Sequence, residues 1–146
     1  MADTSLTLDE IVISRLESGK KSELSSALGE AMLQELRLKG CTLKCVANTL
    51  PRQIVARAIG VNNSNLHKLY RRKRLSRVQS ERISDLTAFW AEMNGIFMHD
   101  DLVLDEWLNS KLPALGGLSP MQMMETLPGR KALREILNRL QYGDFS

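Results

Sequence analysis

The densest charge in the sequence lies in the stretch LHKLYRRKRLSR, residues 66–77, where six of the twelve positions are Lys or Arg. Guanidinium and ammonium groups bind phosphate oxygens, so this stretch is suited to a nucleic acid. Two other interpretations are a solvated charge run at a helix end and a docking site for a protein partner. The surrounding charge favours the first interpretation. Residues 52–82 hold nine basic residues and one acid, whereas residues 83–110 hold six acids and no Lys or Arg.

The other reactive side chains form no catalytic or metal-binding pattern. Cys41 and Cys45 lie four apart, on one face if the region is helical, but two thiols do not complete a tetrahedral zinc site. We expect these thiols to be buried or idle, because a reducing cytosol disfavours a disulfide. His99 precedes Asp100 and Asp101, which we interpret as helix-capping residues. With no nucleophile–base order and no glycine-rich phosphate loop, the sequence predicts neither an enzyme nor a cofactor or metal site.

The composition is that of a chain able to build a hydrophobic core. The 146 residues are 43% hydrophobic and 25% charged, which is ordinary for a globular domain. The apolar runs are too short to span a bilayer. The N-terminal residues MADTSLTLDE lack the basic and apolar regions of a signal peptide, so we expect a cytoplasmic protein.

Helix start and stop signals recur along the whole chain and predict an all-α fold. The sequences TLDE, SRVQ and SPMQ, which begin at Thr7, Ser76 and Ser119, each fit a capping box. Glycines stand where apolar periodicity stops, as expected at helix C-termini: Gly19, Gly40, Gly60 and Gly143. No alternating run of β-branched residues is long enough to compete with this pattern.

Apolar residues spaced three and four apart mark the individual helices. The longest helix is expected after Ser76, with a stripe that we interpret as core or as a dimer seam. In chain order, the stripes are Leu8, Ile11, Val12 and Leu16; Leu24, Leu28, Ala31 and Leu36; Ile83, Leu86, Trp90, Met93 and Phe97; Leu104, Trp107 and Leu108; and Leu133, Ile136, Leu137 and Leu140. We predict an N-terminal helical extension (residues 1–49), a DNA-binding region (50–82), and a long helix with a C-terminal domain (83–146).

Residues 51–74, PRQIVARAIGVNNSNLHKLYRRKR, fit a helix-turn-helix. The first helix has an apolar inner face, Gly60 turns the chain and Val61 fills the corner. Asn62 can cap the second helix, whose Leu66 and Leu69, three apart, then face inward. A glycine turn followed by an apolar plug and a polar cap is typical of this motif.

In a helix-turn-helix the first residues of the second helix enter the major groove. Here the candidates for base contacts are Asn63, Ser64, Asn65, His67 and Lys68. The candidates for phosphate contacts are Arg71, Arg72, Lys73, Arg74 and Arg77. Phosphate contacts set affinity and salt dependence but carry little sequence information. We expect a homodimer on operator DNA, since paired half-sites give a single motif its specificity.

The C-terminal run WLNSKLPALGGLSPMQMMETLPGRKALREILNRLQYGDFS resembles the toxin-binding domain of the Xre/MbcA/ParS family of bacterial antitoxins. The matching elements are Trp107-Leu108, Leu115-Gly116-Gly117, Pro120, Gly129, Leu137, Leu140 and Tyr142-Gly143. Upstream, LPRQIVARAIGVNNSNLHKLYRRKRLSRVQSERI resembles the Xre-like helix-turn-helix of the same family. Both motifs occur in the family's order and spacing over residues 50–146.

The resemblance implies an antitoxin of a type II toxin–antitoxin pair that represses its own operon. The usual partner in the family is a RES-domain toxin, which consumes NAD, and the antitoxin's C-terminal region covers the entrance to the toxin's active site. The candidate toxin-binding residues are Leu115, Gly116, Gly117, Arg139, Tyr142, Gly143, Asp144, Phe145 and Ser146. The alternative function is a stand-alone helix-turn-helix regulator whose C-terminal domain serves dimerisation or binds another partner.

Two parts of this candidate site have a purely structural alternative. Tyr142 and Phe145 can anchor a partner, or they can fold back on the protein's own core. Gly116 and Gly117 can contact the toxin, or they can simply permit a tight turn before Ser119.

Overall fold

The computed structural model describes residues 7–17, 33 and 35–143. Over these residues the regular structure consists of eight α-helices and two short 3₁₀ helices, without a strand, which confirms the predicted all-α fold. Within the same residues, no helix combines the length and the apolar character needed to cross a membrane.

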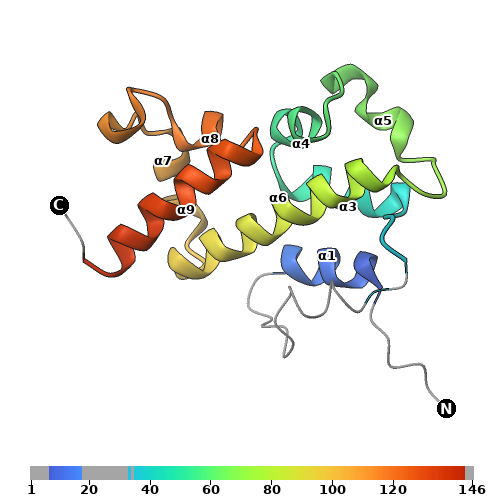
Figure 1. Cartoon of the computed structure of the whole chain (residues 1–146), viewed down its shortest axis with the longest axis horizontal. Helices are drawn as coiled ribbons and strands as arrows, with labels where there is room; N and C mark the ends of the chain where they lie inside the picture. The colour runs from blue at the N-terminus through green and yellow to red at the C-terminus, as the bar shows by residue number, and fades with distance from the viewer. Residues whose placement is uncertain (1–6, 18–32, 34, 144–146) are drawn as a thin grey trace, which may run out of the picture.

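The helices are arranged around α6 (Arg77–Ile96), which runs through the middle of the molecule (Figure 1). The others are α1 (Leu8–Leu16), α3 (Gly40–Thr49), α4 (Arg52–Ile59), α5 (Leu66–Leu69), α7 (Asp101–Asn109), α8 (Pro120–Met123) and α9 (Leu127–Gln141). The two 3₁₀ helices are η1 (Asn63–Asn65) and η2 (Pro113–Leu115). Helices α3, α4 and α5 surround the N-terminal end of α6, α1 lies along its side, and α7, α8 and α9 gather near its C-terminal end (Figure 1).

Capping boxes fix where two of these helices begin. The Ser76 hydroxyl accepts a hydrogen bond from the Gln79 backbone N–H at 3.0 Å, and the Gln79 side chain accepts one from the Ser76 N–H at 3.1 Å. Ser119 and Gln122 repeat this exchange at the start of α8. At α1 the Thr7 hydroxyl accepts from the Glu10 N–H at 3.1 Å. Each of these side chains satisfies a backbone donor that a helix start leaves free.

The predicted stripe on α6 forms the core. Ile83, Leu86 and Met93 are fully buried, and Phe89, which the stripe omitted, is buried between them. These residues belong to one hydrophobic cluster that extends from Leu8 on α1 to residues of α9. The core is therefore continuous across the boundary that the sequence suggested near residue 82.

Two of the glycines predicted at helix C-termini are found there, and a third is not. Gly60 and Gly143 have φ angles of 74° and 68°, the left-handed conformation expected just beyond a helix. Gly40 instead begins α3, so its assignment to a helix C-terminus is wrong. A Cβ at Gly40 would collide with the carbonyl oxygens of Leu69, Tyr70 and Arg72, which shows that the glycine is needed for close backbone packing. Gly19 and the stripe Leu24, Leu28 and Ala31 lie outside the described residues.

Candidate nucleic-acid and partner-binding surfaces

Helix α4, the turn at Gly60 and the segment η1–α5 occupy the residues predicted to form a helix-turn-helix. The Val61 N–H donates to the Ala56 carbonyl at 3.0 Å, which closes the turn after α4. Leu66 and Leu69 are buried, as their spacing predicted. The buried side of this segment thus fixes the orientation of the residues on its outer side.

The second helix is shorter than the sequence suggested. It begins as a 3₁₀ turn in which the Asn62 carbonyl accepts from the Asn65 N–H at 2.9 Å. The Asn62 side chain makes no capping hydrogen bond, so the predicted capping role is wrong, because the tight 3₁₀ start uses the backbone carbonyl instead. After Leu69 the chain leaves the helix, and residues 71–74 form a loop.

The five candidates for base contacts, Asn63, Ser64, Asn65, His67 and Lys68, are all exposed. Among the candidates for phosphate contacts, Arg71, Arg72 and Lys73 are exposed in the loop. Arg77 is exposed on α6, with its Nε 3.3 Å from Glu81 Oε1. Arg74 is only half exposed. Its Nη1 donates to the Arg37 carbonyl at 2.9 Å and lies 3.6 Å from Asp9 Oδ2, so this arginine also holds the loop in place.

Residues before α3 anchor the basic loop by its backbone. The Gly40 N–H donates to the Arg72 carbonyl at 3.0 Å, and the Leu75 N–H donates to the Leu38 carbonyl at 2.7 Å. The Arg37 Nε donates to the Leu75 carbonyl at 2.7 Å. Because hydrogen bonds join both sides of the loop to residues 37–40, the backbone that carries its cationic side chains is held in place.

Asp9 of α1 contacts both the residues that hold the loop and the loop itself. Its buried carboxylate accepts from the Lys39 N–H at 2.9 Å and from the Thr42 hydroxyl at 2.5 Å, in addition to its contact with Arg74. Sequence reasoning gave residues 1–49 no role in the candidate DNA surface. The position of Asp9 between Leu8 and Ile11, beside the apolar stripe of this helix, was the feature that could have indicated a buried carboxylate with polar partners.

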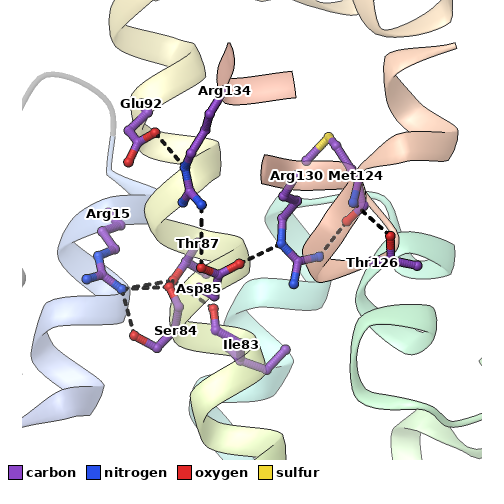
Figure 2. A network of polar contacts seen from close by, with 11 residues as sticks. Arg15, Ile83, Ser84, Asp85, Thr87, Glu92, Met124, Thr126, Arg130 and Arg134 are labelled. Atoms are coloured by element: carbon purple, nitrogen blue, oxygen red, sulfur yellow. Dashed lines mark hydrogen bonds and ion pairs between the residues drawn. The ribbon is translucent and has the colours of Figure 1, made fainter. Parts of the chain in front are cut away.

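Beside the middle of α6, two arginines of α9 point toward α6 (Figure 2). Arg130 is only 1% exposed; its Nε donates to Asp85 Oδ2 at 2.7 Å and its Nη1 to the Met124 carbonyl at 2.6 Å. Arg134 donates to Glu92 Oε2 at 3.1 Å and packs its guanidinium over the Phe89 ring. Two of the six acids between residues 83 and 110 are therefore used to hold α9 against α6.

Helix α1 is tied to the same part of α6. The Arg15 Nη1 donates to the Ser84 carbonyl at 2.9 Å, to the Ser84 hydroxyl at 3.1 Å and to the Thr87 hydroxyl at 3.3 Å (Figure 2). Polar bonds therefore hold both α1 and α9 to the middle of α6.

The connector that contains Gly116 and Gly117 has the geometry of a tight turn. The two residues have φ angles of 65° and 86°, and a Cβ at either would meet no other atom within 4 Å. The Gly117 N–H donates to the Leu112 carbonyl at 3.1 Å, and the Leu112 N–H donates to the Leu118 carbonyl at 3.2 Å. The glycines are thus explained by the turn, while both remain exposed beside the half-buried Leu115.

The end of α9 exposes apolar surface. Tyr142 is 82% exposed, and Leu140 is exposed beside it. Arg139 and Gly143 are exposed as well. Folding back on the core is therefore excluded for Tyr142. Asp144, Phe145 and Ser146 lie outside the described residues.

The remaining reactive residues have structural explanations. Asp100 Oδ1 accepts from the N–H groups of Leu102 and Val103 at 3.2 and 3.3 Å, which confirms its capping role at α7. Cys41 and Cys45 do share a face of α3, but both are exposed. Of the two expected states, buried or idle, burial is therefore ruled out for both thiols, because the buried face of α3 is formed by Thr42, Leu43, Val46 and Ala47.

Three exposed apolar residues at the junction of α6 and α7 were missed: Met98, Leu102 and Val103. The sequence held a signal for two of them. The predicted stripe Leu104, Trp107 and Leu108 turns one face of α7 inward, and Leu102 and Val103 do not belong to that stripe.

Helices α7, α8 and α9 form a small helical unit on the C-terminal end of α6, with an exposed apolar end. Residues 95–143, which include this unit, match the family described as the antitoxin Xre/MbcA/ParS C-terminal toxin-binding domain. This match confirms the resemblance predicted for the C-terminal part of the chain.

A relative of Sphingobium sp. (strain YBL2), the Prs ADP-ribosylating antitoxin, is 37% identical to this chain over 43 residues. Those residues are 30% of this chain and 27% of the relative, so the chain spans only about a quarter of that protein. No solved structure matches the chain.

Proposed function

We propose that this protein is an antitoxin that binds and neutralises a cognate toxin through its C-terminal domain. The observation that carries the proposal is the match of residues 95–143 to a toxin-binding domain of antitoxins. The exposed Tyr142 at the end of that segment supports it, because an aromatic side chain left in water is suited to anchoring a partner. In this proposal the protein acts by binding and has no catalytic activity of its own.

The proposed toxin is of the RES type and consumes NAD, and the C-terminal tail covers the entrance to its active site. The name of the Sphingobium relative, which joins ADP-ribosylation to an antitoxin, supports this class of chemistry. The acidic Asp144 would then face the cationic lining of a phosphate-binding pocket.

A second proposed activity is repression of the protein's own operon by a homodimer that binds operator DNA through α4, η1 and α5. The exposure of residues 63–65 supports base contacts, and the exposure of Arg71, Arg72 and Lys73 supports phosphate contacts. The bonds that fix the backbone of the basic loop support this role, because a fixed loop loses little entropy on binding.

The double substitution Tyr142→Ala with Phe145→Ala tests toxin neutralisation. Coexpressed with the product of the adjacent open reading frame, this variant should fail to protect cells that the unchanged protein protects, because it lacks the proposed anchors. Operator binding should persist. The matched control is Lys131→Ala, an exposed change on α9 that should leave protection intact. Full protection by the double variant would overturn the tail model.

The double substitution Arg71→Ala with Arg72→Ala tests DNA binding. Each lost phosphate contact should lower the slope of log K against log salt by about 0.9, so the pair should lower it by about 2. Arg74 is left unchanged because it also holds the loop. Titration of operator DNA at several salt concentrations measures the slope, with Lys131→Ala as control. Unchanged affinity and slope would show that this loop does not bind DNA.

A further inference from the structure

The junction of α6 and α7 exposes apolar side chains that are not part of the hydrophobic core. Met98 is 85% exposed and Leu102 is 79% exposed, with Val103 partly exposed beside them. Helix α7 is held to the protein by its other face: Leu104 is buried, as is Leu108, and the Trp107 ring lies 5.2 Å from the Phe97 ring. The outward direction of Leu102 therefore follows from the way α7 is fixed, and not from a loose segment.

Acidic residues of α7 flank this apolar surface. Asp105 and Glu106 lie three and four positions after Leu102, which places all three on the outer side of α7, and Asp101 precedes them. All three acids are exposed, and residues 83–110 contain no Lys or Arg. The acids Asp85 and Glu92 bind arginines of α9, whereas the acids of α7 face outward.

Two residues of the junction, Met98 and His99, have a strained backbone conformation. Met98 and His99 have φ angles of 56° and 59°, a left-handed conformation that Gly and Asn adopt more readily. The Met98 N–H donates to the Gly95 carbonyl at 3.2 Å, and the His99 N–H to the Asn94 carbonyl at 2.8 Å, so the turn is fixed. A methionine there adds strain without gaining burial, and such strain is concentrated at functional sites.

This surface lies at the same end of the molecule as Tyr142. Arg130 pairs with Asp85 while Arg134, one turn later, reaches Glu92, so α9 and α6 run in the same direction. Figure 1 shows the C-terminal ends of the two helices on the same side of the molecule. The junction and the end of α9 are therefore placed to contact one partner together, and both fall within residues 95–143.

We propose that Met98, Leu102 and Val103, with the acids Asp101, Asp105 and Glu106, form a second contact surface for the toxin, and that the facing surface of the toxin is basic with an apolar centre. The inference rests on the proposed function and adds to it a site distinct from the tail. Exposed apolar residues flanked by charged ones are typical of a protein contact, and the negative charge favours a cationic partner.

The double substitution Met98→Asn with Leu102→Ser separates binding from folding. Asparagine suits the left-handed conformation better than methionine, so the variant should be no less stable at residue 98 while it loses both apolar side chains. We expect its Kd for the purified product of the adjacent open reading frame to rise roughly 10- to 100-fold in calorimetry. The matched control is Val78→Ser, because Val78 is 56% exposed at the other end of α6 and its loss should leave the Kd unchanged.

A second variant, Asp105→Asn with Glu106→Gln, tests the charge. It should weaken binding at low salt and make the remaining affinity less sensitive to salt. If both variants bind as tightly as the unchanged chain while Tyr142→Ala binds more weakly, the second surface is refuted and the antitoxin role stands. If sedimentation shows that the first variant loses self-association with toxin affinity intact, the surface serves a second copy of this chain, and the inference is wrong. If the unchanged chain does not bind the product at all, the proposed function fails as well.

Discussion

The residues around the N-terminal end of α6 and those that follow α6 differ in which side chains they expose and which they bury. Near its N-terminal end, leucines such as Leu66 are buried and the cations of the loop, among them Arg71 and Arg72, are exposed. In the part of the chain that follows α6, Arg130 is buried and paired with Asp85 of the middle of α6, while Met98 and Tyr142 are exposed. Phosphates are bound by accessible cations, whereas protein partners are bound by accessible apolar and aromatic groups. The contrast supports assigning two different kinds of partner to the two regions.

The same residue type therefore has two uses in this chain. A guanidinium removed from water loses its hydration, and it is tolerated in the core only when paired and hydrogen-bonded. Arg130 meets this condition through Asp85 and the Met124 carbonyl, so it serves the attachment of α9 to α6. Clusters of arginine in a sequence thus do not by themselves distinguish a binding surface from a structural bond.

Asp85→Ala should have the largest effect on stability. It leaves the guanidinium of Arg130 buried without its carboxylate, and we expect a loss of about 3 kcal/mol in the free energy of unfolding, measured by urea denaturation. The matched control is Arg77→Ala, which breaks the exposed Arg77–Glu81 pair and should cost about 0.5 kcal/mol or less. Equal losses from the two variants would show that the buried and exposed arginines do not differ as proposed.

Gly40→Ala should have the next largest effect, beside the N-terminal end of α6. The added methyl group would press on the carbonyl oxygens of residues 69, 70 and 72, which are backbone atoms and cannot rotate away. We expect a loss of about 1–3 kcal/mol in unfolding free energy, together with weaker DNA binding, because the basic loop must shift. Cys41→Ala, at the exposed neighbouring position, should change stability by less than about 0.5 kcal/mol. A stable Gly40→Ala variant that binds DNA normally would show that the loop does not depend on this packing.

The helices were predictable because their signals are local. The boxes at Ser76 and Ser119 depend on residues three apart, and the stripe of α6 depends on spacings of three and four. The burial of Leu66 and Leu69 was predicted in the same way, from their spacing of three positions. These features need no knowledge of which helices meet.

What the sequence missed depends on contacts between distant segments. Arg130 and Asp85 are 45 positions apart, and Asp9 and Lys39 are 30 apart. No short-range pattern identifies such pairs, so the sequence predicted no role for Arg130 or Asp85, and Asp9 entered only as part of the capping sequence TLDE. Gly40 was misassigned for the same reason: its small size serves the backbone of residues 69–72, not its own helix.

Gly95→Ala should have the smallest effect and the opposite sign. Gly95 lies in the last turn of α6 with a negative φ, it is exposed, and a Cβ there would meet no atom within 4 Å. Alanine restricts the unfolded chain more than glycine does, so we expect a gain of about 0.5–1 kcal/mol in unfolding free energy, measured by thermal and urea denaturation. Because the same substitution is made in a helix at both positions, the difference in unfolding free energy between Gly40→Ala and Gly95→Ala isolates the effect of the backbone atoms around Gly40. If Gly95→Ala is destabilising instead, the turn through Met98 and His99 needs freedom at Gly95, and toxin affinity should then fall together with stability.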